Sequence, residues 1–290
     1  MIYNNYLHFP QINPVIFSIG PINFYWYGLM YALSFFFAIY VGKKKSKKSL
    51  GVWKKEEINN LFHMSFWGAI IGGRLGYVLF YNIQLFLNNP FYLFKIWEGG
   101  MSFHGGLIGV IVIAFYFSKN SNKSFLKITD LIAPLIPFGL GAGRLGNFIN
   151  GELWGRVSTS SCFSMLFPKS REIDLILAKN NIQYQILLKN YGVLPRHPSQ
   201  IYEFFLEGIL LFFIMNIIAK KYKKTGITSG TFMIIYGIFR IFSEFFREPD
   251  PQLGLFLKTI SMGQILSLPM IFFGIFILIY SLNGFFYKNK

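Results

Sequence analysis

Apolar stretches recur along the chain at near-regular intervals, and each is about long enough to cross a bilayer. Spans of about 20 residues are predicted near residues 20–41, 58–81, 101–118, 128–147, 199–219, 229–247 and 263–284. The fourth is interrupted by Pro134 and Pro137, and its far end runs into a glycine-rich stretch. The pattern predicts an all-α polytopic membrane protein with seven transmembrane helices.

One stretch concentrates the groups that lipid normally excludes. Residues 139–156 read Gly-Leu-Gly-Ala-Gly-Arg-Leu-Gly-Asn-Phe-Ile-Asn-Gly-Glu-Leu-Trp-Gly-Arg. Irregular glycine-rich backbone at membrane depth is tolerated only where protein or a water-filled cavity surrounds it. We therefore expect this stretch to line a cavity. Arg144 and Asn147 are three residues apart, so a continuous helix would place them on one face.

Composition and charge agree with this class and add an orientation. The chain is 53% hydrophobic and only 14% charged, against roughly 25% charged in soluble domains. Basic residues cluster after the first, third and fifth spans and at the chain end. The positive-inside rule then predicts an external amino terminus and a cytoplasmic carboxyl terminus. The net charge of +16 reflects this topology and contact with membrane lipid, so we expect no nucleic-acid partner.

A single membrane domain, residues 1–290, is predicted. Residues 157–196 form its only long extramembrane segment, which is too short for a large independent core and is expected to be a small external, periplasmic cap. The single cysteine, Cys162, excludes an intramolecular disulfide and a multi-cysteine metal site. The first 42 residues contain no Lys or Arg, so span one lacks the charged leader of a cleaved signal peptide.

Span six carries a polar stripe on an otherwise apolar helix. Tyr236, Arg240 and Glu244 are spaced four and four. An arginine in lipid costs at least about 2.5 kcal/mol, so the stripe must face protein or a cavity. A structural Arg240–Glu244 ion pair that holds helices together is the alternative interpretation, but it leaves Arg144 at a similar depth unexplained. Two planar guanidinium groups in the outer half of the bundle suit phosphate and predict a site for an anionic phospholipid.

Histidine chemistry is indicated at the outer end of span three. His104 lies beside Gly105 and Gly106, and its side chain exchanges a proton near neutral pH. A histidine satisfied at a helix start is the alternative, and we favour the functional role. Arg74 in span two is equally consistent with a structural or a functional role.

Two further patterns concern helix packing. Gly68, Gly72 and Gly76 form a small-residue stripe along span two, which allows a neighbouring helix to approach closely. Glu203 and Glu207, four apart in span five, are expected to share a face turned toward the bundle.

Residues 143–155 resemble the signature of the prolipoprotein diacylglyceryl transferases, bacterial membrane enzymes that lipidate lipoprotein precursors. The similarity extends to residues 26–29 (Trp-Tyr-Gly-Leu), 104–107 (His-Gly-Gly-Leu), 197–200 (His-Pro-Ser-Gln) and 240–250. It covers nearly the whole chain. Cys162 stands where a family proline is expected.

The resemblance implies transfer of a diacylglyceryl group from phosphatidylglycerol to the lipobox cysteine of a prolipoprotein, in the bacterial inner membrane, with no metal or cofactor. Arg144 and Arg240 would then hold the phosphate, Asn147, Glu152 and Gly155 would shape that site, His104 would serve the thiol, and Tyr27, Tyr236 and Glu244 would support them. Either His104 or the arginines alone would generate the thiolate.

Two other classes of function use the same arginines. A lipid flippase or transporter would guide headgroups across the bilayer, but transporters show inverted repeats and paired broken helices, which this sequence does not display. A lipid-binding scaffold would need the phosphate-binding arginines but not His104.

Overall fold

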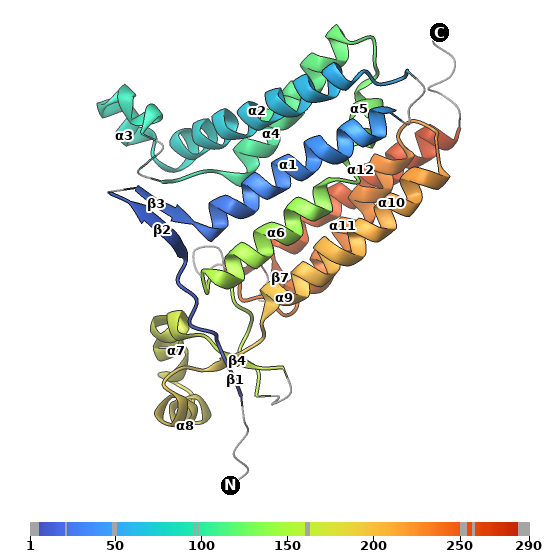
Figure 1. The fold of residues 1–290 in the computed structure, drawn as a ribbon. Coiled ribbons are helices and arrows are strands. Elements are labelled where there is room, and N and C mark those ends of the chain that lie inside the picture. The colour runs from blue at the N-terminus through green and yellow to red at the C-terminus, as the bar shows by residue number, and fades with distance from the viewer. Residues whose placement is uncertain are drawn as a thin grey trace. The chain divides into compact units, whose positions relative to one another are not determined.

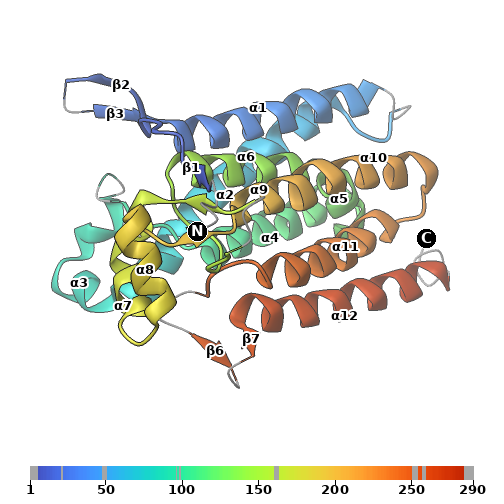
Figure 2. The ribbon, with the colours of Figure 1, turned by 90° about the horizontal axis from the view of Figure 1, so that it is seen from below.

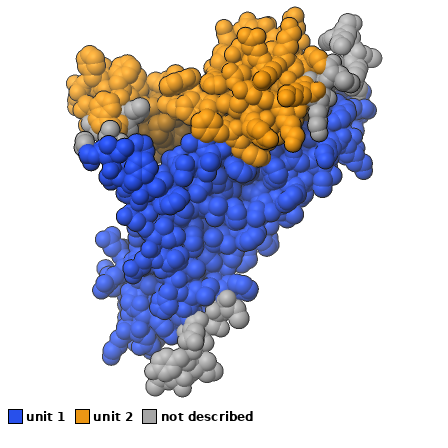
Figure 3. Space-filling model, viewed as in Figure 1, with its two compact units in different colours: residues 1–34, 133–290 blue, residues 35–132 orange. Residues whose placement is uncertain are grey.

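The computed structural model describes residues 6–20, 22–47, 51–95, 97, 99–159, 163–249, 254–256 and 259–283, and it is mostly helical (Figure 1). Cys162 lies outside the described residues. The chain divides into two compact units (Figure 3). Unit 1 comprises residues 1–34 and 133–290, and unit 2 comprises residues 35–132. The first long helix, α1 (Trp26–Lys47), contributes residues to both units.

Unit 2 is built on two long helices, α2 (Lys55–Tyr81) and α4 (Phe103–Asn120). Its shorter elements are α3 (Ile83–Asn88), η1 (Pro90–Phe94) and α5 (Phe125–Ile132). The glycine stripe of α2 packs against glycines of α4: a Cβ atom on Gly76 would lie 2.8 Å from the Cα of Gly105, and one on Gly72 would lie 3.0 Å from the Cα of Gly109. The predicted close approach of a neighbouring helix is thus confirmed.

Arg74 of α2 is buried beneath the connection between α2 and α4. Its five N–H groups donate to five backbone carbonyls, of Tyr92, Leu93, Lys95, Gly99 and Gly100, at 2.6–3.2 Å. The guanidinium also lies 4.9 Å from the centre of the Tyr92 ring. Because every donor is used to hold backbone, the structural role weighed for Arg74 is the one that this geometry favours.

The membrane helices of unit 1 lie side by side (Figures 1 and 2). They are α6 (Ile136–Ile149), α9 (Ser199–Glu203), the π-helical η4 (Phe204–Leu210), α10 (Leu211–Lys221), α11 (Ile227–Glu244) and α12 (Met262–Leu282). Glycines again set the spacing. A Cβ atom on Gly141 of α6 would lie 3.0 Å from the Cα of Gly208 in η4, and one on Gly274 of α12 would lie 2.7 Å from the carbonyl oxygen of Gly230 in α11.

Three helices in the described part of the chain are long and apolar enough to cross a membrane: Phe103–Asn120, Ser199–Lys221 and Met262–Leu282. Helices α5 and α6 make a fourth if the pair is one span, bent by 48°. Pro134 lies in the break between them. It accounts for the break, because proline removes a helical hydrogen bond and clashes with the preceding turn. The prediction of a mostly helical membrane protein is confirmed, whereas the count of seven spans stays a prediction.

Short strands lie outside the membrane helices. In the cap region, β1 (Leu7–His8) pairs in parallel with β4 (Met165–Leu166), which pairs antiparallel with β5 (Pro195–Arg196). The helical elements here are η3 (Pro168–Ser170), α7 (Arg171–Ala178) and α8 (Ile182–Tyr191). Tyr6, Leu166 and Val193 form a small buried cluster. Tyr6, the residue just before β1, is therefore part of this region's core, whereas both residues of β1 are exposed.

Two hairpins complete the described elements: β2 (Val15–Ile19) with β3 (Ile22–Tyr25), and β6 (Leu255–Phe256) with β7 (Ile260–Ser261). The first carries exposed apolar side chains and a stacked pair, Phe17 on Phe24, with ring centres 4.5 Å apart. An uncharged apolar hairpin of this kind is suited to the headgroup level of a membrane.

Candidate functional site

Three arginines and three glutamates meet inside unit 1. Glu203, at the end of α9, is only 1% exposed. Its Oε2 lies 2.7 Å from Arg144 Nε, and its Oε1 lies 2.9 Å from Arg240 Nη1 and 3.4 Å from Arg247 Nη1. One buried carboxylate therefore joins three guanidinium groups carried by α6, by α11 and by the segment after α11.

The other two glutamates complete the charge balance. Glu207 in η4 is 0% exposed and lies 3.2 Å from Arg144 Nη2 and 3.7 Å from Arg240 Nη1. Glu244 pairs with Arg240 and accepts a hydrogen bond from Ser261 Oγ at 2.7 Å. The Arg240–Glu244 pair, which the sequence offered as the alternative to a phosphate site, is present as one part of a larger cluster. Such pairing offsets the desolvation of the buried charges.

The arginines present a more open face than the carboxylates behind them. The side chains of Arg144 and Arg240 are 16% and 15% exposed. In the described part of the chain, Arg144 Nη1 and Arg240 Nε have no hydrogen-bond partner. These N–H groups suit an anion approaching from the open side, because guanidinium donors match the geometry of phosphate oxygens.

The end of α6 and the loop after it bring together Asn147, Asn150 and Glu152. The Nδ2 groups of Asn147 and Asn150 donate to Glu152 Oε1 at 2.9 and 3.3 Å. The Glu152 backbone N–H donates to the Asn147 carbonyl at 3.1 Å, and Gln200 Nε2 donates to the Glu152 carbonyl at 2.7 Å. The carboxylate of Glu152 is thus held in place by both asparagines.

Gly155 is enclosed by two other segments. Its N–H donates to the His197 carbonyl at 2.8 Å. An added Cβ atom would lie 2.6 Å from that carbonyl oxygen and would overlap the carbonyl oxygen of Phe246. Only glycine fits here without moving the backbone. Gly151, with φ +60°, provides the left-handed turn that starts this loop.

Of the two predicted tyrosines, Tyr27 lies on α1 and Tyr236 lies on α11, the helix that carries Arg240. The ring of Tyr27 packs on α6, since a Cβ atom on Gly146 would lie 2.6 Å from Tyr27 Cδ2. Its hydroxyl is 3.2 Å from that of Tyr31. Tyr236 stacks on Phe232 with ring centres 5.6 Å apart and packs against the buried cluster of Ala133, Leu211 and Met215.

His104 belongs to unit 2 and is described there by itself. It is an exposed residue in the first turn of α4, whose start is capped by Ser102 Oγ accepting from the Gly105 N–H at 3.3 Å. Its ring lies 5.7 Å from that of Phe103, and its nitrogens have no hydrogen-bond partner among the described residues. A ring without a structural partner at a helix start is free for proton transfer, and its role stays a prediction.

Sequence reasoning left out two features of the site. It placed Glu203 and Glu207 toward the bundle, which their burial confirms, without assigning them to the arginines; four-residue spacing inside a span was the available signal. It also missed Arg196, which is fully buried and donates to Asp174 Oδ1 at 2.9 Å, Glu248 Oε2 at 2.9 Å and the Gly155 carbonyl at 3.0 Å. Arg196 therefore ties the cap to the loop of Gly155.

The neighbouring His197 sits just before the fifth predicted span. Burial lowers the pKa of His197 below its usual range. Its Nδ1 lies 3.2 Å from the Tyr202 hydroxyl, and its ring contacts Phe246 with ring centres 5.3 Å apart. The neutral imidazole is therefore favoured, in keeping with a packing role.

Long apolar helices around a buried ionic cluster define an integral membrane protein. The family model described as prolipoprotein diacylglyceryl transferase matches residues 14–280. The chain is 58% identical over 271 residues to the phosphatidylglycerol–prolipoprotein diacylglyceryl transferase of Sodalis glossinidius (strain morsitans), covering 93% of each chain. It is 59% identical over 278 residues to that of Erwinia tasmaniensis, covering 96% and 95%, and 56% identical over 278 residues to that of Serratia proteamaculans, covering 96% of each. The chain belongs to the prolipoprotein diacylglyceryl transferase family and is a membrane transferase of lipoprotein biosynthesis.

Proposed function

We propose that this chain transfers the sn-1,2-diacylglyceryl group from phosphatidylglycerol to the thiol of the lipobox cysteine of prolipoproteins, the first step of lipoprotein maturation. The names of its relatives support this reaction. The observation that carries it is the joining of Arg144 and Arg240 through one buried carboxylate, with N–H groups left over on their open side. The phosphate of the lipid binds to these N–H groups.

The reaction balances as a displacement at carbon. A bond forms between the cysteine sulfur and the glyceryl carbon that carried the phosphate, and the bond from that carbon to the phosphate oxygen breaks. The electron pair stays on the oxygen, and glycerol phosphate leaves. Arg144 and Arg240 stabilise the charge that develops on the phosphate. No metal or cofactor takes part in this scheme.

His104 is the proposed general base that accepts the thiol proton. The alternative is that the arginines alone stabilise the thiolate, since nearby cations lower the pKa of a thiol, and that His104 positions the peptide. Asn147, Glu152 and Gly155 shape the phosphate site, and Tyr27, Tyr236 and Glu244 support it. The protein is proposed to cross the bacterial inner membrane seven times as one domain, with residues 157–196 as a cap outside.

The test is a transfer assay with the purified full-length protein, phosphatidylglycerol and a lipobox peptide. Label in the diacylated glycerol should appear on the peptide, whereas label in the headgroup glycerol should not. A Cys→Ser peptide should stay unlabelled. Arg144→Ala should abolish transfer and Arg144→Lys should recover only part of it, because lysine lacks the planar fork. Absence of label with wild-type protein that still binds the lipid would reject the transferase in favour of a scaffold or a flippase.

A pH profile separates the two roles of His104. If His104 is the base, His104→Gln should lower kcat by about 10²–10⁴-fold and remove the acidic limb of the profile. A variant with raised peptide KM but an unchanged pH profile would instead assign His104 to positioning the peptide.

A further inference from the structure

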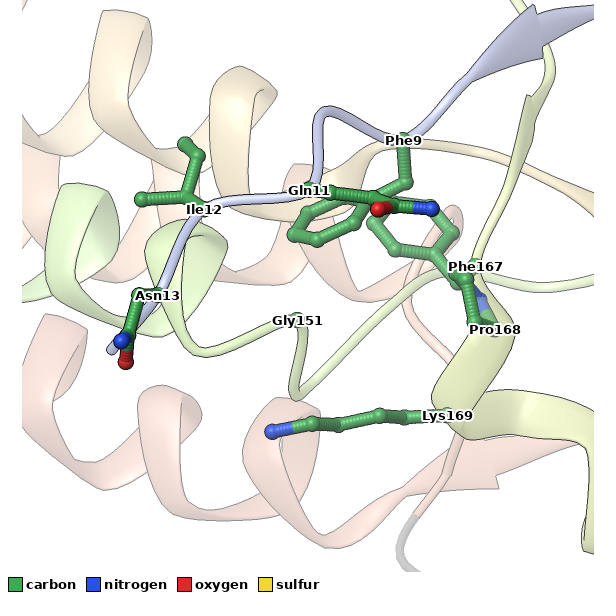
Figure 4. A pocket seen from close by; sticks show the side chains of 8 residues that line it. All are labelled: Phe9, Gln11, Ile12, Asn13, Gly151, Phe167, Pro168 and Lys169. Carbon is green, nitrogen blue, oxygen red and sulfur yellow. The ribbon is translucent and has the colours of Figure 1, made fainter. Parts of the chain in front are cut away.

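Unit 1 contains a cavity of about 370 Å³ next to the loop that follows α6 (Figure 4). It is lined by the N-terminal segment, by the turn at Gly151 and by the start of the cap: Phe9, Gln11, Ile12, Asn13, Gly151, Phe167, Pro168 and Lys169. Its volume falls within the range of sites that hold small ligands or short chain segments. None of the arginines of the cluster lines it.

The cavity shares a wall with the proposed site. Lys169 Nζ donates to the Asn150 carbonyl at 2.7 Å, and Asn150 Nδ2 donates to Glu152. The turn at Gly151 faces the Phe9 ring, since a Cβ atom there would lie 3.3 Å from Phe9 Cζ. A ligand in the cavity therefore rests on the same loop that carries Glu152.

The lining offers a polypeptide both apolar contacts and hydrogen-bond donors. The rings of Phe9 and Phe167, 5.4 Å apart, form an apolar end, and Gln11 lies on the segment that follows Phe9 (Figure 4). The backbone N–H groups of Gln11 and Asn13 have no protein partner within the described part of the chain. An added main chain supplies carbonyls for such donors and side chains for apolar contacts. An acyl chain would use only the apolar part of the lining.

We propose that this cavity binds the extended stretch of prolipoprotein that flanks the acceptor cysteine. The inference rests on the proposed function, and it gives the two substrates separate positions: the phosphate of the lipid on the arginines, and the polypeptide between the N-terminal segment and the cap. The lining has no carboxylate and one ammonium group, that of Lys169, so carbonyl-rich main chain or acidic side chains are favoured over basic ones.

Filling the cavity tests the proposal. Ile12→Trp should raise the KM for the lipobox peptide at least fivefold, while the KM for phosphatidylglycerol and kcat stay within twofold of wild type. Leu175→Trp, on an exposed position of α7, is the matched control and should change none of the three. A merely structural defect would lower kcat or alter both KM values. A rise confined to the KM for phosphatidylglycerol would assign the cavity to lipid and overturn the proposal.

Crosslinking gives a readout independent of turnover. A photoreactive benzophenone residue at position 11 should capture the Cys→Ser peptide, and excess unlabelled peptide should compete while phosphatidylglycerol should not. The same residue at position 175 should capture nothing. No capture at position 11, together with an unchanged peptide KM in Ile12→Trp, would reject the proposal. Capture at position 11, together with a wild-type protein that fails to transfer label, would support the cavity and reject the proposed reaction.

Discussion

At the scale of single residues, Glu203 decides how the cluster is held together. Two helices each bring an arginine to this carboxylate, and Arg247 adds a third cation after α11. Like charges so close would repel strongly in a low-dielectric interior. The carboxylate offsets that repulsion and fixes the distance between the guanidinium groups of Arg144 and Arg240. A phosphate bound by both arginines would have to fit that distance.

We expect Glu203→Gln to lower the free energy of unfolding by roughly 3–5 kcal/mol, because it leaves buried cations uncompensated. Thermal or denaturant unfolding in one detergent measures this change.

The matched control is Glu57→Gln. Glu57 pairs with Lys123, and the side chains of Glu57 and Lys123 are 25% and 11% exposed. Burial raises the pKa of Glu57, but the Lys123 and Lys54 hydrogen bonds outweigh burial and hold it below its usual range. The carboxylate is charged at neutral pH, and losing this more open pair should cost about 1 kcal/mol or less. Equal losses in the two variants would contradict the central role of Glu203.

At the scale of elements, glycines let helices approach at three places. They lie between α2 and α4, between α6 and η4, and between α11 and α12. The second of these contacts brings the helix of Arg144 against that of Glu207. Without a hydrophobic driving force between helices in lipid, close backbone packing supplies much of the association. The small residues thus set the distances on which the ionic cluster depends.

Gly72→Ala is expected to destabilise unit 2 by about 1–3 kcal/mol, the usual cost of overpacking, because the added methyl would overlap the carbonyl oxygen of Gly105. Gly28→Ala is the control, since nothing lies within 4 Å of its added Cβ, and it should be neutral or slightly stabilising. Melting temperatures of the two purified variants provide the comparison. If Gly72→Ala melted like Gly28→Ala, the α2–α4 contact would be looser than described.

At the scale of the whole molecule, the distribution of lysines predicts the orientation of the chain. Their clusters after alternate predicted spans predict that those connections lie in the cytoplasm and that the segment containing Cys162 lies outside. Since Cys162 is the only cysteine, it is a natural reporter of that orientation.

A membrane-impermeant maleimide should label Cys162 in intact spheroplasts without permeabilisation. Two variants in a Cys162→Ser background serve as controls. Lys179→Cys, at the exposed position that follows α7, should label in the same way. Lys47→Cys, at the end of α1, should label only after the membrane is opened. Labelling of Lys47→Cys from outside would reverse the predicted topology.

Much of this molecule was readable from local pattern alone. Hydrophobic stretches predicted its helical membrane character, and four-residue spacing predicted that the stripe of Arg240 and Glu244 faces protein and that Glu203 and Glu207 face inward. These inferences succeed because spacing along a helix fixes the face on which a side chain lies. The seven spans, the external cap and the roles of the site residues remain predictions.

Tertiary structure decided which groups meet. Glu203 forms ion pairs with Arg144, Arg240 and Arg247, which are 59, 37 and 44 positions away in sequence. No periodicity along a single helix predicts pairs between residues so far apart in sequence. Arg74 pairs with five carbonyls of one connection, and Gly155 fits between two distant backbone segments. Helix crossing and close glycine contacts set these distances. The sequence by itself therefore determined the class of protein and the faces of its helices, and the packing of those faces determined which charges pair.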